Sequence, residues 1–511
     1  MMYSDSQNRL IMGSLLWCCL LLVSCSSREA AQPDNPVAAP NGTASTKGVQ
    51  QQSLTARPTP HLRQPPSPIV VSPDEQIKPA MQPLPIQIDG PAAAARKNPL
   101  DPEKILAQGI RTIQGERLTL YTDMPANEDI QDLPKIVELA IPQWCEHFNI
   151  APEKMVAWKV SVCLIQDRKK FDAAGLIPAT LPSFDHGYAF GNRLFINEQP
   201  SAYYRRHLLL HEATHAFMFE NFSSAGPPWY MEGMAELLAT HTWDGTQLQL
   251  RQMPKTKEDV PYWGRIKIIK EQVAEKKGLM IQEIMNFGSD AKLRLDAYAW
   301  SWAACSFLDT HPVFQKTFRE HLQHVGDSSP EFSLDLVQAY GDQWFQVRQQ
   351  WQVFVMNIEY GFDIKREAID VVEVRPLELA AEVISVRADR GWQSTGLRVT
   401  AGMKLAITAT GRFIIHREDS AEQPQGVPLE SEAGGITIRY HRGQPLGKLL
   451  IALDEPQQLG ETGLAHSGPV GAGGDIMIPS NGVLYFRVND SPAELAANEG
   501  ALQVTVQQIT D

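Results

Sequence analysis

The segment RRHLLLHEATHAFMFENF (residues 205–222) constrains the fold most, because two of its histidines stand four residues apart. Side chains at positions i and i+4 of a helix lie on one face, so His211 and His215 can bind one metal ion. Glu212 would then lie beside the ion, placed to take a proton from a water molecule. The apolar flanks predict a largely buried helix, and a core helix whose histidines make only hydrogen bonds is the alternative.

A second segment, PPWYMEGMAELLA (residues 227–239), supplies further candidate ligands. A catalytic zinc ion takes three protein ligands and keeps one position open. The two prolines start a helix, on which Glu232 and Glu236 share a face. We predict that Glu232 is the third ligand and that Glu236 accepts a hydrogen bond from an imidazole N–H. Gly233 would let the two helices approach closely, and a solvated acidic face is the alternative for the glutamates.

Together, HEATH and WYMEGMAE resemble the gluzincin metallopeptidases, specifically the bacterial MA-like peptidase domains, over about residues 115–310. The resemblance implies a zincin-like fold, Zn²⁺ bound by His211, His215 and Glu232, and Glu212 as the general base for peptide hydrolysis. In that family an edge strand before the active helix pairs with an extended peptide, and GYAFGNRLFIN (187–197) stands in the matching place.

The same family often has a downstream helix that begins with a tyrosine, similar to AYAWSWAACSFL (297–308) here. The resemblance implies that Tyr298 stabilises the oxyanion of the reaction. We consider His241 a second candidate for that role. Packing in an apolar core is the alternative for Tyr298.

Strands precede helices between residues 101 and 365, which predicts an α+β domain. Residues 116–123 and 156–167 have strand patterns, and residues 186–197 predict two short strands around a Gly191-Asn192 turn. Residues 129–148 predict an amphipathic helix, in which Pro134 and Pro142 indicate a late start or a kink. Further helices are predicted at 201–222, 229–240, 264–274 and 297–308, with others to about residue 360.

Residues 375–511 consist of short β-type runs separated by glycine turns, which predicts an all-β sandwich. The predicted fold class is therefore multidomain, an α+β zincin-like metallopeptidase domain followed by this sandwich. Residues 383–508 resemble the calcium-dependent galactose-binding (galactophilic) bacterial lectins. The resemblance implies Ca²⁺ ligands at Asp490 and Asn498 and a carbohydrate partner, whereas Ala497 replaces an expected ligand. A turn that closes the sandwich without metal is the alternative.

The N-terminus has the pattern of a targeting signal. Arg9 is followed by the apolar run LIMGSLLWCCLLLV, too short to span a membrane comfortably, and then by Ser24 and Cys25. The sequence LVSC resembles a bacterial lipobox, which implies a lipoprotein signal peptide (1–24) and a lipid on Cys25. Because Ser26 follows, the resemblance also implies an outer-membrane location in the cell envelope. A plain signal peptide or a membrane anchor is the alternative. Residues 25–100 are proline-rich and predict a disordered linker.

Charge and cysteine content limit the remaining possibilities. The net charge of −13 argues against binding to nucleic acid. Cys145, Cys163 and Cys305 lie in apolar stretches and are predicted to be buried free thiols, with a Cys145–Cys163 disulfide as the alternative.

The sequence therefore favours a lipid-anchored zinc peptidase, acting on a peptide or protein substrate, with a carbohydrate-targeting domain. Two other functions stay open. One is a non-catalytic envelope protein for binding or adhesion that retains the peptidase fold, and the other is an amidase that acts on peptidoglycan peptides.

Overall fold

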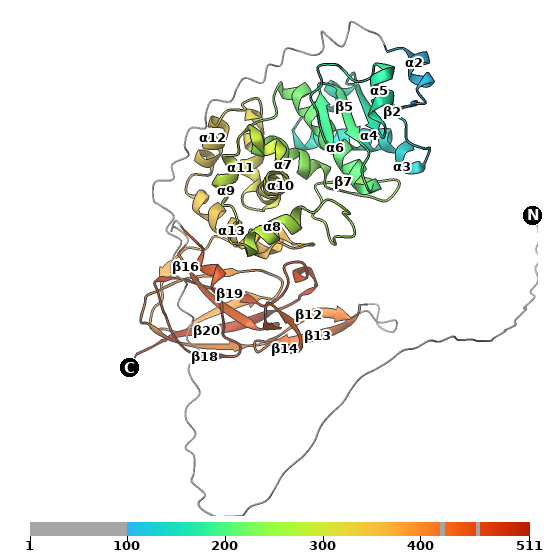
Figure 1. Cartoon of the computed structure of the whole chain (residues 1–511). Coiled ribbons are helices and arrows are strands. Elements are labelled where there is room, and N and C mark those ends of the chain that lie inside the picture. Colours follow the sequence, from blue (N-terminus) through green and yellow to red (C-terminus); the bar gives the residue numbers. More distant parts are fainter. Residues whose placement is uncertain (1–99, 419–424, 456–459, 511) are drawn as a thin grey trace, which may run out of the picture. The chain divides into compact units, whose positions relative to one another are not determined.

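The computed structural model describes residues 100–418, 425–455 and 460–510 (Figure 1). The predicted signal peptide, the predicted lipid attachment site Cys25 and the predicted linker, apart from Leu100, lie outside the described residues. Two large hydrophobic cores organise this part of the chain, one from Leu118 to Ile364 and one from Leu377 to Val506. None of the helices within it is apolar enough over a sufficient length to cross a membrane.

The first core is built on a five-stranded mixed sheet with the order β1-β2-β3-β5-β4. The strands are β1 (Arg111–Gln114), β2 (Leu118–Thr122), β3 (Val160–Ile165), β4 (Gly187–Phe190) and β5 (Arg193–Asn197). The strands β2, β3 and β5 are parallel, whereas β4 pairs antiparallel with β5 and ends the sheet. The β4–β5 hairpin turns at Gly191, whose φ of 59° suits glycine, so the predicted hairpin is confirmed.

One of the helices named here comes between β2 and β3, and the others follow the sheet, as the sequence predicts. They are α4 (Leu133–His147), α6 (Ala202–Phe222), α7 (Pro228–Ala239), α8 (Arg265–Ala274), α9 (Ile281–Met285), α10 (Leu295–Thr310), α11 (Gln315–Glu320), α12 (Glu331–Tyr340), α13 (Gln343–Asn357) and α14 (Ile364–Glu367). The late start expected from Pro134 is confirmed, because a short helix α3 (Glu128–Gln131) ends before α4 begins. Pro142 lies inside α4, and Pro134 lies in its first turn, where a proline is tolerated.

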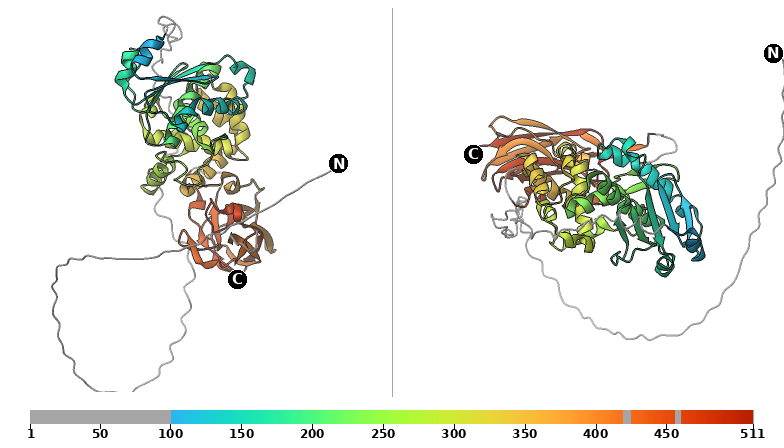
Figure 2. Two further views of the ribbon diagram at one scale, coloured as in Figure 1. Left: turned by 90° about the vertical axis from the view of Figure 1, so that its right-hand side faces the viewer. Right: turned by 90° about the horizontal axis from the view of Figure 1, so that it is seen from above.

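Helix α6 is the central element of the first core. It begins after Ser201, whose hydroxyl accepts a hydrogen bond from the backbone N–H of Tyr204 at 3.1 Å. It contacts α4 and the strands β4 and β5, and it contacts α7 as well (Figure 1 and Figure 2). Because neighbours surround the helix, all but one of the side chains from Tyr203 to Met218 are buried.

One prediction about this packing is wrong. We expected Gly233 to allow a close approach of α7 to α6, but it faces α10 instead. A Cβ atom at Gly233 would lie 2.5 Å from Sγ of Cys305 and 2.5 Å from the carbonyl oxygen of Ser301. The glycine therefore permits α7 and α10 to pack closely, and Cys305 is buried at their contact.

The second core lies between two sheets, as expected for a sandwich. One sheet has the order β17-β16-β19-β10-β8 and the other β18-β11-β20-β9. Their strands are β8 (Arg375–Pro376), β9 (Glu382–Arg387), β10 (Gln393–Val399), β11 (Lys404–Thr410), β16 (Leu449–Asp454), β17 (Gly468–Pro469), β18 (Gly473–Met477), β19 (Gly482–Val488) and β20 (Ala501–Ile509). In β20, Leu502, Val504 and Val506 alternate into the core.

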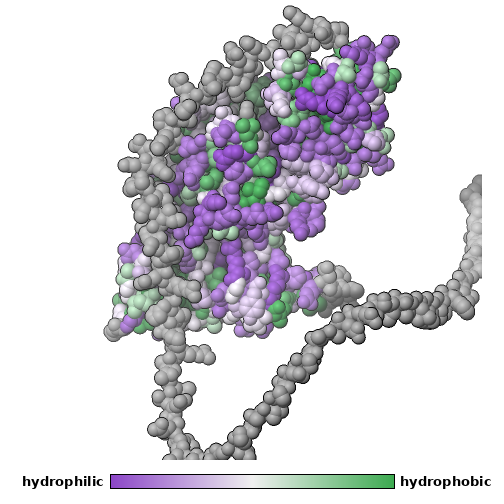
Figure 3. Space-filling view, in the orientation of Figure 1, coloured by the Kyte–Doolittle hydropathy of each residue, from purple (hydrophilic) through white to green (hydrophobic). Residues whose placement is uncertain are grey.

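Polar residues dominate the visible surface (Figure 3), and the described cysteines lie in the interior. The face shown in Figure 3 is mostly hydrophilic, with smaller hydrophobic areas over the helices. Cys145, Cys163 and Cys305 are free and buried, so the prediction of buried thiols is confirmed.

Candidate metal centre

Three predicted ligand atoms converge between α6 and α7. Nε2 of His211 lies 3.1 Å from Nε2 of His215, and Oε2 of Glu232 lies 3.2 Å from the first nitrogen and 3.4 Å from the second. Ligand atoms about 2.0–2.2 Å from a tetrahedral zinc ion are separated from one another by about 3.3–3.5 Å. The three side chains therefore fit a zinc ion by their spacing and by their chemistry.

The surroundings of this triad favour a positive charge among its members. His211, His215 and Glu232 are all buried, and Oε2 of Glu232 makes no hydrogen bond with any described residue. Burial lowers the pKa of His211, but Glu232 and Glu236 outweigh burial and raise it to about 10. Burial raises the pKa of Glu232, but the two histidines outweigh burial and lower it to about 2. The negative charge of the glutamates therefore stabilises a proton on His211. A divalent cation bound by the triad would be stabilised by the same negative charge.

Glu212 lies on the side of α6 that faces the edge strand β4. It is buried, which raises the pKa of its carboxyl group, while a hydrogen bond with the backbone of Ala189 lowers it. A Cβ atom at Gly187 would lie only 2.5 Å from Oε1 of Glu212. Gly187 therefore makes the space that the carboxylate occupies, and the sequence did not reveal this role of the glycine.

Glu236 lies behind the triad and is the most heavily paired carboxylate of the site. Its Oε1 is 3.4 Å from Nδ1 of His211, which agrees with the predicted position beside an imidazole N–H. Arg265 donates hydrogen bonds to both oxygens, to Oε2 from Nε at 3.0 Å and to Oε1 from Nη2 at 2.9 Å. The indole N–H of Trp263 lies 3.3 Å from Oε2, and Nε2 of His207 lies 3.2 Å from it.

The sequence analysis missed His207, Trp263 and Arg265. His207 carried a usable signal, because it precedes His211 by four residues and therefore shares its helical face. Trp263 and Arg265 had no signal of this kind, since they are 27 and 29 residues from Glu236 and reach it only through the tertiary fold.

The cluster of His207, His211 and Glu236 is a second set of side chains close enough to hold a metal ion. Its electrostatics differ from those of the triad, because Arg265 already pairs with both oxygens of Glu236. Burial raises the pKa of Glu236, but Arg265 and His207 outweigh burial and hold it well below its usual value. A guanidinium at this distance repels a second cation, so we favour the triad as the metal site.

Tyr298 lies beside the triad, whereas the contacts of His241 are made with other residues. The ring of Tyr298 lies 5.8 Å from the ring of His211 and 5.6 Å from the guanidinium carbon of Arg265. Burial raises the pKa of Tyr298, and Glu232 and Glu212 raise it further, so the phenol stays protonated. His241 contacts the carbonyl of Ala239 through Nδ1 and Arg206 through Nε2, at 2.8 and 3.3 Å, so neither nitrogen is available to an oxyanion.

The two predicted calcium ligands contact each other. The amide nitrogen of Asn498 lies 2.8 Å from Oδ2 of Asp490 and 3.1 Å from the carbonyl oxygen of Ala388. Oδ1 of Asn498 is buried and makes no hydrogen bond within the described part of the chain. Burial raises the pKa of Asp490. The loop also packs against the end of the helical region, since the carbonyl of Pro492 accepts a hydrogen bond from the N–H of Asp363 at 3.1 Å.

No protein-family model matches this chain, and neither does any curated protein. Among solved structures, one described as "EclA N-terminal domain; PllA-like lectin" is 21% identical, covers 25% of this chain and 95% of its own, and has a TM-score of 0.19. The PliG protein of Aeromonas hydrophila, described as a periplasmic inhibitor of g-type lysozyme, is 11% identical, covers 28% of this chain and all of its own, and has a TM-score of 0.15. TM-scores this low carry no argument about function.

Proposed function

We propose that this chain is a zinc-dependent peptidase in which residues 101–365 form a zincin-like domain. The observation that carries the proposal is the convergence of Nε2 of His211, Nε2 of His215 and Oε2 of Glu232 within 3.1–3.4 Å of one another. Glu212 follows the first of these ligands in the sequence and is buried against β4. A zinc ion held by these residues supplies a Lewis acid that polarises a carbonyl group and makes a water molecule more acidic.

The protein side chains would divide the remaining work. Glu212 takes a proton from the water that attacks the peptide carbonyl carbon, and later gives a proton to the amine as the C–N bond breaks. Burial raises the pKa of Glu212, which suits a group that must both accept and release a proton. The protonated phenol of Tyr298, beside His211, donates a hydrogen bond to the oxyanion.

The edge strand β4 is the proposed binding surface for the substrate backbone. Among the strands of the described residues it pairs only with β5, so one of its edges can accept an extended peptide. The contact between Ala189 of β4 and the carboxylate of Glu212 brings this strand next to the general base. A peptide paired with β4 would therefore pass the catalytic residues.

The proposal is tested with an unfolded protein substrate, such as reduced and alkylated casein, incubated with the purified chain and zinc. We expect cleavage by the wild type and a loss of roughly 10²- to 10⁴-fold in Glu212→Gln, which keeps the size of the side chain but not its basicity. Equal cleavage by the variant would contradict the role of Glu212. Cleavage of peptidoglycan peptides alone would favour the amidase, and zinc binding without any cleavage would favour the binding protein.

We further propose that residues 375–511 bind calcium and through it a sugar, and that lipid on Cys25 anchors the chain in the cell envelope. The buried Oδ1 of Asn498, beside the carboxylate of Asp490, is the kind of acceptor that a calcium ion satisfies. Calorimetric titration with calcium should show binding to the wild type that is lost in Asp490→Asn. Titration with galactose should then give a signal only in the presence of calcium. Absence of calcium binding to the wild type would remove this part of the proposal.

A further inference from the structure

Glu236 is held by more donors than a buried carboxylate needs for neutralisation. Arg265 binds both oxygens, and the indole of Trp263 and the imidazole of His207 add two contacts to Oε2. Glu236 is 2% exposed, and its three partners are buried as well. One neighbour remains, which is Nδ1 of the proposed zinc ligand His211, 3.4 Å from Oε1.

Arg265 is itself held in place. Its Nη1 donates a hydrogen bond to the carbonyl of Trp263 at 3.2 Å, and the ring of Tyr298 lies against its guanidinium. Trp263 packs edge to face on Trp302, with ring centroids 4.7 Å apart. The guanidinium therefore reaches Glu236 from the buried first residue of α8, and not from a flexible surface position.

A planar guanidinium that pairs with both carboxylate oxygens fixes the plane of the carboxylate as well as its charge. Once that plane is fixed, the position of Oε1 relative to His211 is fixed as well. An imidazole whose Nδ1 faces a carboxylate presents its Nε2 to a metal ion. We propose that Arg265 is a positioning residue for the zinc ligand His211, acting through Glu236; this inference rests on the proposed zinc site.

Charge gives Arg265 a second effect, on which carboxylate is free to bind the ion. Without the guanidinium, Glu236 would be a buried carboxylate beside the triad without its main counter-ion. It could then turn toward a metal ion, since His207, His211 and Glu236 already lie close enough to hold one. Arg265 therefore keeps Glu236 as a support for His211 and prevents it from competing as a ligand.

The test measures the dissociation constant of zinc for the full chain, by competition with a chromophoric chelator. Arg265→Gln should bind zinc roughly 10- to 100-fold more weakly than the wild type. Arg265→Lys keeps the positive charge but cannot pair with both carboxylate oxygens as the planar guanidinium does. The zinc affinity of this variant should therefore lie between those of the wild type and Arg265→Gln. The double variant Arg265→Gln/Glu236→Gln should bind no more weakly than Glu236→Gln alone, because Arg265 acts through Glu236.

A matched control is Arg487→Gln, which removes a buried arginine from a pair with Glu367, outside the triad and its contacts. It should leave zinc affinity within about twofold of the wild type, so a general loss of stability is separated from a local effect. Should Arg265→Gln fail to fold, as judged by circular dichroism, Arg265→Lys decides, and wild-type affinity in that variant overturns the inference.

The outcomes separate this inference from the proposed function. A wild type that binds no zinc overturns both. A wild type that binds zinc and cleaves peptide, together with an Arg265→Gln variant of unchanged or tighter affinity, overturns the positioning role alone. Additive losses in the double variant also overturn it, since they would mean that Arg265 does not act through Glu236.

Discussion

His207, His211 and His215 recur every four residues along α6, and each lies close to a carboxylate from α7. Glu232 contacts the last two, and Glu236 contacts the first two. The spacing of four on both helices produces this match, because each turn of α6 meets one turn of α7. A substitution on either helix therefore affects partners on the other.

Gly187 provides a test of the position of Glu212. In Gly187→Ala, the new methyl group would approach Oε1 of Glu212 to 2.5 Å, so the carboxylate or β4 must move. We predict a loss of about 10- to 100-fold in peptide cleavage, which a displacement of about 1 Å can cause, with zinc affinity unchanged. Cleavage rate and zinc content should be measured on the same sample.

The matched control is Gly434→Ala, since a Cβ atom at Gly434 would meet no other atom within 4 Å. This variant should cleave at the wild-type rate. A Gly187→Ala variant that does the same would show that β4 yields to Glu212 and that the glycine is not needed there.

The candidate site was only partly predictable from the sequence. His211, His215 and Glu232 were predictable because helical geometry converts their spacing into a shared face. Arg265 was not, because its pairing with Glu236 depends on how the loop before α8 folds back on α7. Gly233 was predicted to face α6 but faces α10. The sequence shows that this position of the helix has no side chain, but it does not show which neighbouring helix packs there.

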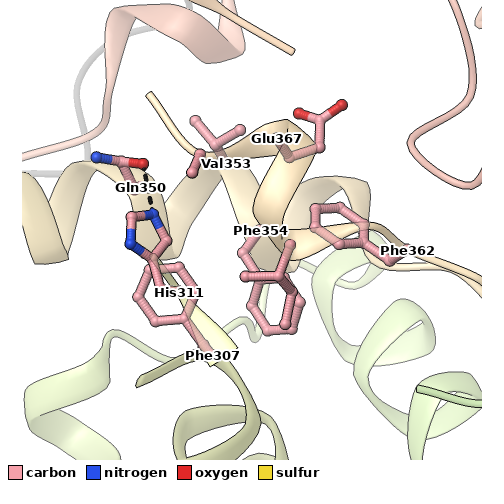
Figure 4. A pocket seen from close by; sticks show the side chains of 9 residues that line it. Phe307, His311, Gln350, Val353, Phe354, Phe362 and Glu367 are labelled. Atoms are coloured by element: carbon pink, nitrogen blue, oxygen red, sulfur yellow. Dashed lines mark hydrogen bonds between the residues drawn. The ribbon is translucent and has the colours of Figure 1, made fainter. Parts of the chain in front are cut away.

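At the scale of elements, His311 joins the end of α10 to α13. The backbone N–H of Val313 donates a hydrogen bond to its Nδ1 at 3.2 Å, so the proton of the neutral ring lies on Nε2. Nε2 donates to Oε1 of Gln350 on α13 at 2.8 Å (Figure 4). The ring also stacks on Phe314, with centroids 3.9 Å apart. Figure 4 shows this histidine on a small cavity that no member of the metal triad lines.

This arrangement predicts a pH dependence of stability. Burial lowers the pKa of His311 from 6.5 to about 4, although the bond to Gln350 opposes the shift. The unfolded chain then binds more protons between these two pH values, so stability rises with pH across this window and is lost as pH falls. We expect His311 to contribute a loss of about 3 kcal/mol in unfolding free energy between pH 6.5 and 4.

This contribution is measured by urea denaturation of the wild type and of His311→Gln at several pH values. The unfolding free energy of the wild type should rise more steeply with pH between 4 and 6.5 than that of the variant. Glu367 lines the same cavity, but its carboxylate pairs with Arg487, 3.1 Å away. The buried His147 and the half-buried His441 also have pKa values lowered to about 4, so the wild type keeps other acid-sensitive groups. Parallel pH profiles for the two proteins would contradict the assignment to His311.

The elements themselves were largely predictable, and the exceptions are short. The hairpin of β6 (His241–Trp243) and β7 (Leu248–Leu250) and the strand β1 were not predicted. Strands of three or four residues show too little alternation to be distinguished from loops. The long helices have many periodic apolar positions, and the β4–β5 hairpin has a specific turn. These features made both kinds of element predictable from the sequence.

At the scale of the whole molecule, a buried ion pair joins the helical region to the sandwich. Arg487 of β19 contacts Glu367 of α14 through Nη2 at 3.1 Å, and both side chains are buried. The guanidinium also lies 5.7 Å from the ring of Trp392. The sequence resemblances assign the two regions separately, so they gave no reason to expect this contact.

Removal of one member of the pair should be costly, because it leaves the other charge buried without a partner. We predict that Glu367→Gln lowers the unfolding free energy by about 3–5 kcal/mol. The double variant Glu367→Gln/Arg487→Gln should lose less than the sum of the two single losses. The unfolding free energies of the two single variants and the double variant are measured by urea denaturation, followed by tryptophan fluorescence. A loss below about 1 kcal/mol in Glu367→Gln would mean that solvent reaches the pair.

The central claim concerns the metal, and metal content tests it most directly. The purified full chain, dialysed against metal-free buffer after loading with zinc, should retain about one zinc ion per chain by elemental analysis. Glu232→Ala removes one of the three ligands and should retain almost none under the same conditions. Retention of zinc by Glu232→Ala, or a wild type that holds no zinc, would contradict the account of this site.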